Sequence, residues 1–206
     1  MFMKFNIIFE NEDLLAIEKP AGINSDDFEK RVHRLDKDTS GILLIAKNEE
    51  ALNYLQKQFK ERKVEKKYIA LVVGNVKNED GIIETLIGRS SKDRKKQKVF
   101  LPGEPNSQGK RDAKTIYSLL QRFKNYDLIE IKPLTGRKHQ IRTHLTYLNH
   151  PIAGDKMYGF KNQPCPKNLK RQFLHASYLK INYKGKEIEL QSDLPQDLKE
   201  VLNTIN

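Results

Sequence analysis

The chain has 206 residues, which is enough for a single domain with a sizeable buried core. Its 38 lysines and arginines outnumber its 27 acidic residues, and the net charge of +11 points to a nucleic acid or an anionic membrane surface as partner. The apolar runs, such as the five residues Ile42–Ala46, are too short to span a bilayer, and the N-terminus lacks the pattern of a secretory signal. The only cysteine, Cys165, cannot form an internal disulfide, which is typical of a reducing cytoplasm.

Short apolar segments typical of β-strands dominate the chain. The first two flank the turn-prone sequence Asn11-Glu12-Asp13 and predict a hairpin, and the last two flank Lys184-Gly185 and predict another. In chain order, the predicted strands are Phe5–Phe9, Leu14–Glu18, Ile42–Ala46, Tyr68–Val73, Ile82–Ile87, Lys98–Leu101, Lys114–Leu120, Asp127–Ile131, Phe173–Asn182 and Glu187–Leu190.

Helical patterns are fewer. Glu49–Lys60 carries apolar residues at the spacing of one buried helix face, and Asn48 is a suitable N-cap. Arg137–Leu148 repeats the pattern, with Thr135 as the expected N-cap. A short helix is also predicted at the C-terminus, over Gln196–Asn203.

Many strands, few helices and no regular alternation of the two predict an α+β fold. We expect a mixed, mainly antiparallel central sheet flanked by helices and loops, in one domain covering residues 1–206. The basic stretch Gly88–Ser107 is the most loop-like part of the chain and is interpreted as an excursion from the sheet.

A polar cluster, Val32–Gly41, precedes the apolar run Ile42–Ala46. The carboxylate of Asp36 would lie at the mouth of a buried strand, where partial loss of hydration requires a cation or hydrogen-bond donors. Arg34 and Lys37 are the nearest cations in the sequence. The alternative interpretation is a turn in which Asp36 or Asp38 only caps backbone N–H groups.

A second cluster of basic side chains covers Thr135–His144. On the predicted helix, Lys138 and Arg142 are i,i+4 neighbours beside the apolar stripe. A half-buried cation there needs an anion, either a phosphate or a protein carboxylate, unless this is simply a solvated basic face. His139 and His144 diverge on such a helix, and no other spacing indicates a metal site.

Tyr68 is the third candidate, because it opens a strand directly after Lys66 and Lys67. An aromatic ring beside basic side chains can stack on a nucleobase while the cations contact phosphates. The alternative is that Tyr68 only packs in the core. No glycine-rich phosphate-binding motif occurs, so a nucleotide cofactor is not indicated.

These clusters belong to a longer ordered set of motifs. They are His33-Arg34-Leu35-Asp36 with Thr39-Ser40-Gly41, Lys66-Lys67-Tyr68, Leu134-Thr-Gly-Arg-Lys-His-Gln-Ile-Arg142-Thr-His144-Leu, His150-Pro-Ile-Ala-Gly-Asp155 and Phe173-Leu-His175-Ala. In this order they resemble the motifs of the RluA family of pseudouridine synthases, over about Ile7 to Leu194. A single motif would be weak, whereas the ordered set is highly specific and favours the functional interpretations.

The resemblance implies that the chain isomerises uridine to pseudouridine in RNA, in a cleft across the sheet and without a metal or an organic cofactor. Asp36 matches the obligatory aspartate nucleophile of the family, and Tyr68 matches the tyrosine that stacks on the target base. Arg142 matches the basic residue that pairs with the aspartate, and Arg34 matches the arginine that enters the RNA stack as the base leaves. Attack by Asp36 at C1′, attack at C6 and a glycal route all stay open.

RNA is thus the expected partner, with large-subunit ribosomal RNA as the leading substrate. The alternatives are a tRNA substrate and a catalytically silent protein that binds RNA or ribosomes. We expect a cytoplasmic monomer with no membrane contact, no small-molecule cofactor and no S4-type N-terminal domain. Only ten residues separate Gly22 from His33, where the family often has a longer insert. The expected phosphate-binding residues are Arg89, Lys92, Arg94, Lys95, Lys96, Arg137 and Lys138.

Overall fold

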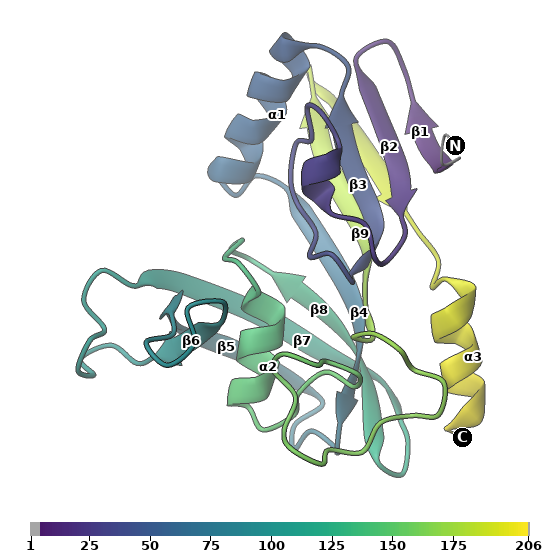
Figure 1. Cartoon of the computed structure of the whole chain (residues 1–206). Coiled ribbons are helices and arrows are strands. Elements are labelled where there is room, and N and C mark those ends of the chain that lie inside the picture. Colours follow the sequence, from purple (N-terminus) through teal and green to yellow (C-terminus); the bar gives the residue numbers. More distant parts are fainter. Residues whose placement is uncertain (1–4, 206) are drawn as a thin grey trace. The chain divides into compact units, whose positions relative to one another are not determined.

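The computed structural model describes residues 5–205 (Figure 1). Within them, ten strands and three α-helices give the expected α+β class. The chain folds into two compact units. Unit 1 contains the chain up to Tyr68 together with His175–Pro195, and unit 2 contains Ile69–Leu174 together with the residues from Gln196 onward.

The ten strands form a mainly antiparallel sheet, as predicted, in which β3 and β9 pair in parallel. The hydrogen-bonded order is β1-β2-β3-β9-β4-β8-β7-β5-β6, and β10 pairs with β9. The strands are β1 (Asn6–Glu10), β2 (Leu14–Lys19), β3 (Ser40–Ala46), β4 (Glu65–Val73), β5 (Asp80–Arg89), β6 (Gln97–Phe100), β7 (Arg111–Arg122), β8 (Tyr126–Pro133), β9 (Leu174–Tyr183) and β10 (Lys186–Gln191).

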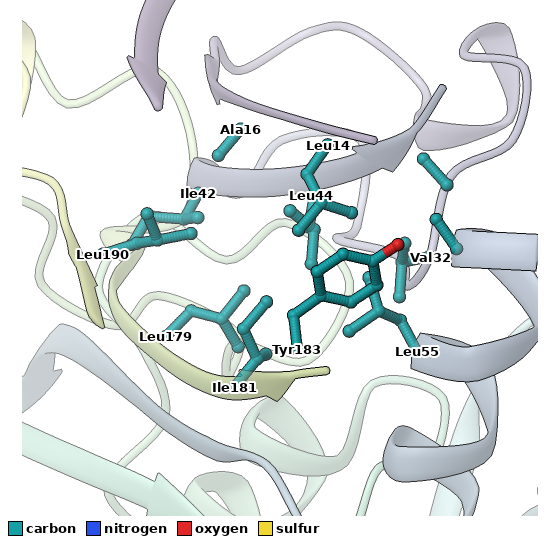
Figure 2. Close-up of a cluster of buried hydrophobic side chains, with 12 residues drawn as sticks. Leu14, Ala16, Val32, Ile42, Leu44, Leu55, Leu179, Ile181, Tyr183 and Leu190 are labelled. Atoms are coloured by element: carbon teal, nitrogen blue, oxygen red, sulfur yellow. The ribbon is translucent and has the colours of Figure 1, made fainter. Parts of the chain in front are cut away.

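Unit 1 has its own apolar core. Alternate residues of the strands point to one face, and Figure 2 shows side chains such as Leu14, Leu44 and Leu179 meeting there. Helix α1 (Glu49–Lys60) contributes Leu55 to this cluster. The helix begins where expected, because the Asn48 side chain accepts a hydrogen bond from the Ala51 amide at 2.9 Å.

Unit 2 contains antiparallel neighbours β8, β7, β5 and β6, and the helices α2 (Gln140–Tyr147) and α3 (Gln196–Thr204). Strands β5 and β7 pair over eight consecutive positions, from Asp80 opposite Ser118 to Ile87 opposite Arg111. Among residues 5–205, no helix has the length and apolar character needed to cross a membrane.

The start of α2 differs from the prediction. The helix begins at Gln140, three residues later than expected, and Thr135 is not its N-cap. The Thr135 hydroxyl instead donates to Gln140 Oε1 at 2.7 Å, and the Arg137 amide donates to the same oxygen at 2.9 Å. These bonds fold Thr135–His139 into a turn, which ends at His139 in the left-handed region with φ 55°. Lys138 therefore precedes the helix and is not an i,i+4 helical neighbour of Arg142.

Candidate active site

Asp36 lies in a tight loop that leads into β3 in unit 1. The Thr39 amide donates to the Asp36 carbonyl at 3.0 Å and closes a turn around the loop. The neighbouring side chain of Leu35 is buried, whereas Asp36 itself is half-buried. The turn thus holds the Asp36 loop at the edge of the unit 1 core, with the Asp36 residue partly exposed.

Gly41 explains why the loop ends in the sequence Thr-Ser-Gly. Its φ is +118°, and a Cβ atom at this position would lie 2.2 Å from the carbonyl oxygen of Ala176. Glycine thus allows β3 to begin its parallel pairing with β9, in which Gly41 is opposite Ala176 and Ser40 is opposite His175. The Asp36 loop is therefore anchored at its C-terminal end by direct contact between two backbones.

His175 supports the same anchor with its side chain. Its Nε2 lies 3.0 Å from the Ser192 carbonyl oxygen, which can only accept, so Nε2 carries a proton. In the neutral ring, Nδ1 then accepts from the Ser40 hydroxyl at 2.9 Å. The late Phe-Leu-His-Ala motif thus has a physical role in unit 1, because it holds the first residue of β3.

Tyr68 belongs to unit 1 with Asp36. Burial raises the pKa of the Tyr68 phenol far above its ordinary value, and the negative charge of Asp36 raises it further. Both residues belong to unit 1, and their joint action on one base stays a prediction. With its pKa raised in this way, the Tyr68 phenol is neutral at neutral pH, and its ring is uncharged.

Two other members of the first motif differ in environment. The Arg34 side chain is exposed and can reach a ligand outside the core. His33 stacks on Phe59 with ring centroids 4.8 Å apart, and its Nε2 accepts from the Leu44 amide at 3.2 Å. Burial, with a smaller contribution from the charge of Lys66, lowers the pKa of His33 to about 3. His33 is therefore a neutral packing residue, not a carrier of protons at neutral pH.

Arg142 is buried in unit 2, where it forms a two-pronged ion pair with Asp155. Its Nε and Nη2 donate to the two carboxylate oxygens at 2.7 and 2.8 Å. Its guanidinium also lies 4.9 Å from the ring centroid of Tyr158. Sequence reasoning expected a phosphate or a carboxylate for Arg142, and the structure supplies Asp155. The pairing of Arg142 with Asp36 stays a prediction.

Helix α2 holds Arg142 in place through buried polar contacts with β5 and β7. His144, fully buried, bridges Thr85 at 3.1 Å and Thr115 at 2.8 Å. Gln140 donates to the Thr115 hydroxyl at 3.0 Å. Burial lowers the pKa of His144 to about 4, so the ring is neutral and bridges two hydroxyls instead of binding an anion.

The predicted phosphate-binding residues all lie in unit 2, in two segments. Arg89 ends β5, and the hairpin turn that follows is closed by the Ser90 amide bonding to the Lys96 carbonyl at 3.0 Å. Lys138 is exposed in the turn before α2, while Arg137 is half-buried and its Nε donates to the Asp112 carbonyl at 2.8 Å. Of the predicted residues in the hairpin, Lys96 is half-buried and the other four are exposed: Arg89, Lys92, Arg94 and Lys95.

Tyr158 joins these two basic segments. Its phenol oxygen accepts from the Gln97 amide, at the start of β6, at 2.7 Å. The same oxygen lies 2.8 Å from Nδ1 of His139, in the turn before α2. The structure thus brings the hairpin and the turn to one side chain, in support of a common basic surface. Sequence reasoning did not select Tyr158, since a tyrosine in an irregular segment has no distinctive pattern.

Comparisons with known proteins show to which family the chain belongs. The model of the RNA pseudouridylate synthase family matches residues 28–147, which is more than half of the chain. A protein of Chloroflexus aurantiacus described as an uncharacterized RNA pseudouridine synthase is 43% identical over 176 residues, covering 84% of this chain and 52% of that protein. Ribosomal large subunit pseudouridine synthase C of Rickettsia typhi is 39% identical over 213 residues, covering 92% of this chain and 68% of that protein.

A solved structure supports the same assignment. Human RNA Pseudouridylate Synthase Domain Containing 1 superposes with a TM-score of 0.85 at 28% identity, covering 96% of this chain and 87% of the human one. The chain belongs to the RNA pseudouridylate synthase family, and the resemblance to the RluA family is confirmed. It spans about half the length of the Chloroflexus relative.

No metal site accompanies these residues in the described part of the chain. Residues 5–205 contain no group of three or more His, Cys, Asp or Glu side chains that could hold a metal ion. The groups available for chemistry in unit 1 are a carboxylate at Asp36, a neutral phenol at Tyr68 and an exposed guanidinium at Arg34. A carboxylate, an aromatic ring and a guanidinium are the kinds of group that the family resemblance implies for the site.

Proposed function

We propose that this protein is an RNA pseudouridine synthase that modifies uridine in large-subunit ribosomal RNA, with Asp36 as the nucleophile. The observation that carries the proposal is that the chain belongs to the RNA pseudouridylate synthase family and holds both Asp36 and Tyr68 in unit 1. The ribosomal target is supported by relatives described as large-subunit synthases, including the one from Rickettsia typhi.

The reaction sets clear requirements for such a site. The bond between N1 of uracil and C1′ breaks, a bond between C5 and C1′ forms, the C5 proton is released and N1 gains a proton. The detached uracil must rotate without escaping, and a flat aromatic ring such as Tyr68 holds a base while permitting rotation in its plane. A half-buried carboxylate such as Asp36 is exposed enough to reach a flipped-out uridine and can attack it as a nucleophile.

Release of tritium tests the proposed reaction directly. RNA labelled with tritium at C5 of uridine should release the label to water as the C5–C1′ bond forms. We expect release from large-subunit ribosomal RNA transcripts and none from tRNA. Release from tRNA alone would move the target to tRNA, and RNA binding without release from either would indicate a catalytically silent protein.

Two substitutions of Tyr68 separate stacking from core packing. Tyr68→Phe keeps the ring, so RNA affinity should stay near that of the wild type. Tyr68→Ala removes the stacking surface and should weaken base contact by about 1–3 kcal/mol. Single-turnover rates and RNA dissociation constants measure both effects. If Tyr68→Ala reacts as fast as the wild type, Tyr68 only packs.

The salt dependence of RNA binding tests the basic surface. We expect replacement of Lys92, Arg94, Lys95 and Lys96 by glutamine to weaken binding, because fewer counterions are released from the RNA. The logarithm of the RNA-binding constant decreases with the logarithm of the salt concentration. This negative slope should become shallower by about 0.7–0.9 for each phosphate that the variant no longer neutralises.

A control with the same change in net charge uses exposed residues at the end of α1. They are Lys57, Lys60, Arg62 and Lys63, again replaced by glutamine. The control should keep the wild-type slope. Equal slopes in the wild type and the hairpin variant would place the RNA on another surface.

A further inference from the structure

Lys19, at the end of β2, is one of the largest fully buried side chains described, with 1% of its surface exposed. Its ammonium donates to the carbonyl oxygens of Pro20 at 2.8 Å, Ile23 at 2.9 Å and Lys37 at 3.1 Å. Three N–H donors thus meet three acceptors. The third acceptor belongs to the residue that directly follows Asp36.

Burial of an ammonium group is costly, and an apolar side chain of similar length would fill the same space without that cost. The bonds formed by Lys19 therefore matter for where they hold the chain. They connect three separate points: the end of β2, the turn after it and the Asp36 loop. Hydrogen bonds from a charged donor are about twice as strong as neutral ones, so this junction should resist displacement of the Asp36 loop.

The turn after β2 holds the Asp36 loop from both sides. The Lys37 carbonyl accepts from the Gly22 amide at 2.9 Å as well as from Lys19. On the other side, the Ser25 hydroxyl donates to the Leu35 carbonyl and accepts from the Leu35 amide, both at 2.9 Å. The residues before and after Asp36 are each bonded to the segment 19–25.

We propose that Lys19 is a positioning residue for the nucleophile, with Ser25 as its partner on the other side of Asp36. The inference rests on the proposed function, because it assigns these residues a part in the reaction of Asp36. Lys19 reaches the loop through the Lys37 carbonyl and acts on the position of the Asp36 carboxylate. A displacement of about 1 Å at a reacting group can cost about 100-fold in rate, so loss of the ammonium should be felt mainly in the chemical step.

The test compares Lys19→Met with Lys37→Met in the full chain. Both variants lose one lysine charge near Asp36, but only Lys19→Met removes the donor to the three carbonyls. At a temperature below unfolding, the single-turnover rate of Lys19→Met should fall about 100-fold below that of Lys37→Met. RNA dissociation constants should stay within about threefold, since binding is spread over many phosphate contacts. Hydrogen exchange should rise in residues 35–41 of Lys19→Met alone.

A folded Lys19→Met with the rate and exchange of Lys37→Met would overturn the inference, since a merely structural lysine changes only the melting temperature. If Lys19→Met does not fold, Ser25→Ala decides by the same two measurements, with a slower rate and faster exchange at 35–41 expected. If the wild type acts on no RNA, the proposed function fails instead. The exchange measurement then still decides whether Lys19 holds the Asp36 loop.

Discussion

Asp36→Asn is expected to lower the single-turnover rate by at least about a thousandfold, because the amide cannot act as a nucleophile. The swap is nearly isosteric and leaves the backbone bonds of the loop intact, including that from the Thr39 amide to the Asp36 carbonyl. RNA affinity should therefore stay within a few-fold of the wild type. Tritium release and RNA binding, measured on the same preparation, check both parts.

Asp38→Asn is the matched control for this prediction. Asp38 is exposed and lies two residues further along the same loop. The Asp38→Asn variant should retain a near-wild-type single-turnover rate. That result would show that loss of a negative charge in the loop is not sufficient to stop the reaction. Robust turnover by purified Asp36→Asn would remove Asp36 as the nucleophile.

Arg142→Met should destabilise the protein by about 3–5 kcal/mol at neutral pH, because it leaves the Asp155 carboxylate buried without its cation. For a chain of this size, that corresponds to a fall in melting temperature of about 10 °C. The remaining donors to Asp155 Oδ1, the amides of Met157 and Tyr158 at 2.9 and 3.0 Å, cannot replace the guanidinium. Thermal unfolding at pH 7 measures the effect.

The pH dependence of this effect follows from the pKa of Asp155. Burial alone would raise that pKa, but the hydrogen bonds and charge of Arg142, with two backbone amides, outweigh burial and lower it. The wild type therefore gains stability from Asp155 above about pH 4 and loses it as the pH falls through the lowered pKa. In Arg142→Met, only the two backbone amides oppose the effect of burial on Asp155. The pKa of the Asp155 carboxyl should therefore be higher in this variant than in the wild type. The difference in melting temperature between the two proteins should shrink from pH 7 toward pH 4.

A double variant separates stability from catalysis. Asp155→Asn keeps an acceptor for the two amides and removes the charge, so Arg142→Met with Asp155→Asn should be more stable at pH 7 than Arg142→Met alone. If Arg142 also pairs with Asp36, as the family resemblance implies, the double variant should still react slowly. A wild-type single-turnover rate in the double variant would limit Arg142 to a structural role, and equal melting temperatures for wild type and Arg142→Met would contradict the importance of the ion pair.

Periodicity and turn residues predict most of this fold because they act locally. Helix α1 runs over the predicted Glu49–Lys60, since its apolar face and its Asn48 cap are both encoded within a few residues. The start of α2 was predicted wrongly for the opposite reason. Thr135 bonds to the Gln140 side chain and to the Lys114 amide of β7, and a contact with a distant strand leaves no trace in helical spacing.

The candidate site also combines residues that local sequence motifs identify with residues that only the fold reveals. Asp36, Tyr68 and Arg142 could be selected because they stand in an ordered set of motifs. Asp155 stands only at the end of one such motif, and its ion pair with Arg142 depends on how unit 2 folds. Lys19 carried no functional signal, because a lysine before Pro20 in a basic chain is expected at the surface, whereas the fold buries it against three carbonyls.

Mapping of pseudouridines in cells tests the central claim most directly. Large-subunit ribosomal RNA would be compared among four strains. They are cells with the intact gene, cells in which the gene is deleted, and two deletion strains that express either the wild-type protein or Asp36→Asn. We expect at least one pseudouridine to disappear on deletion, to return with the wild type and to stay absent with Asp36→Asn. An identical set of pseudouridines in the ribosomal RNA of all four strains would contradict the account.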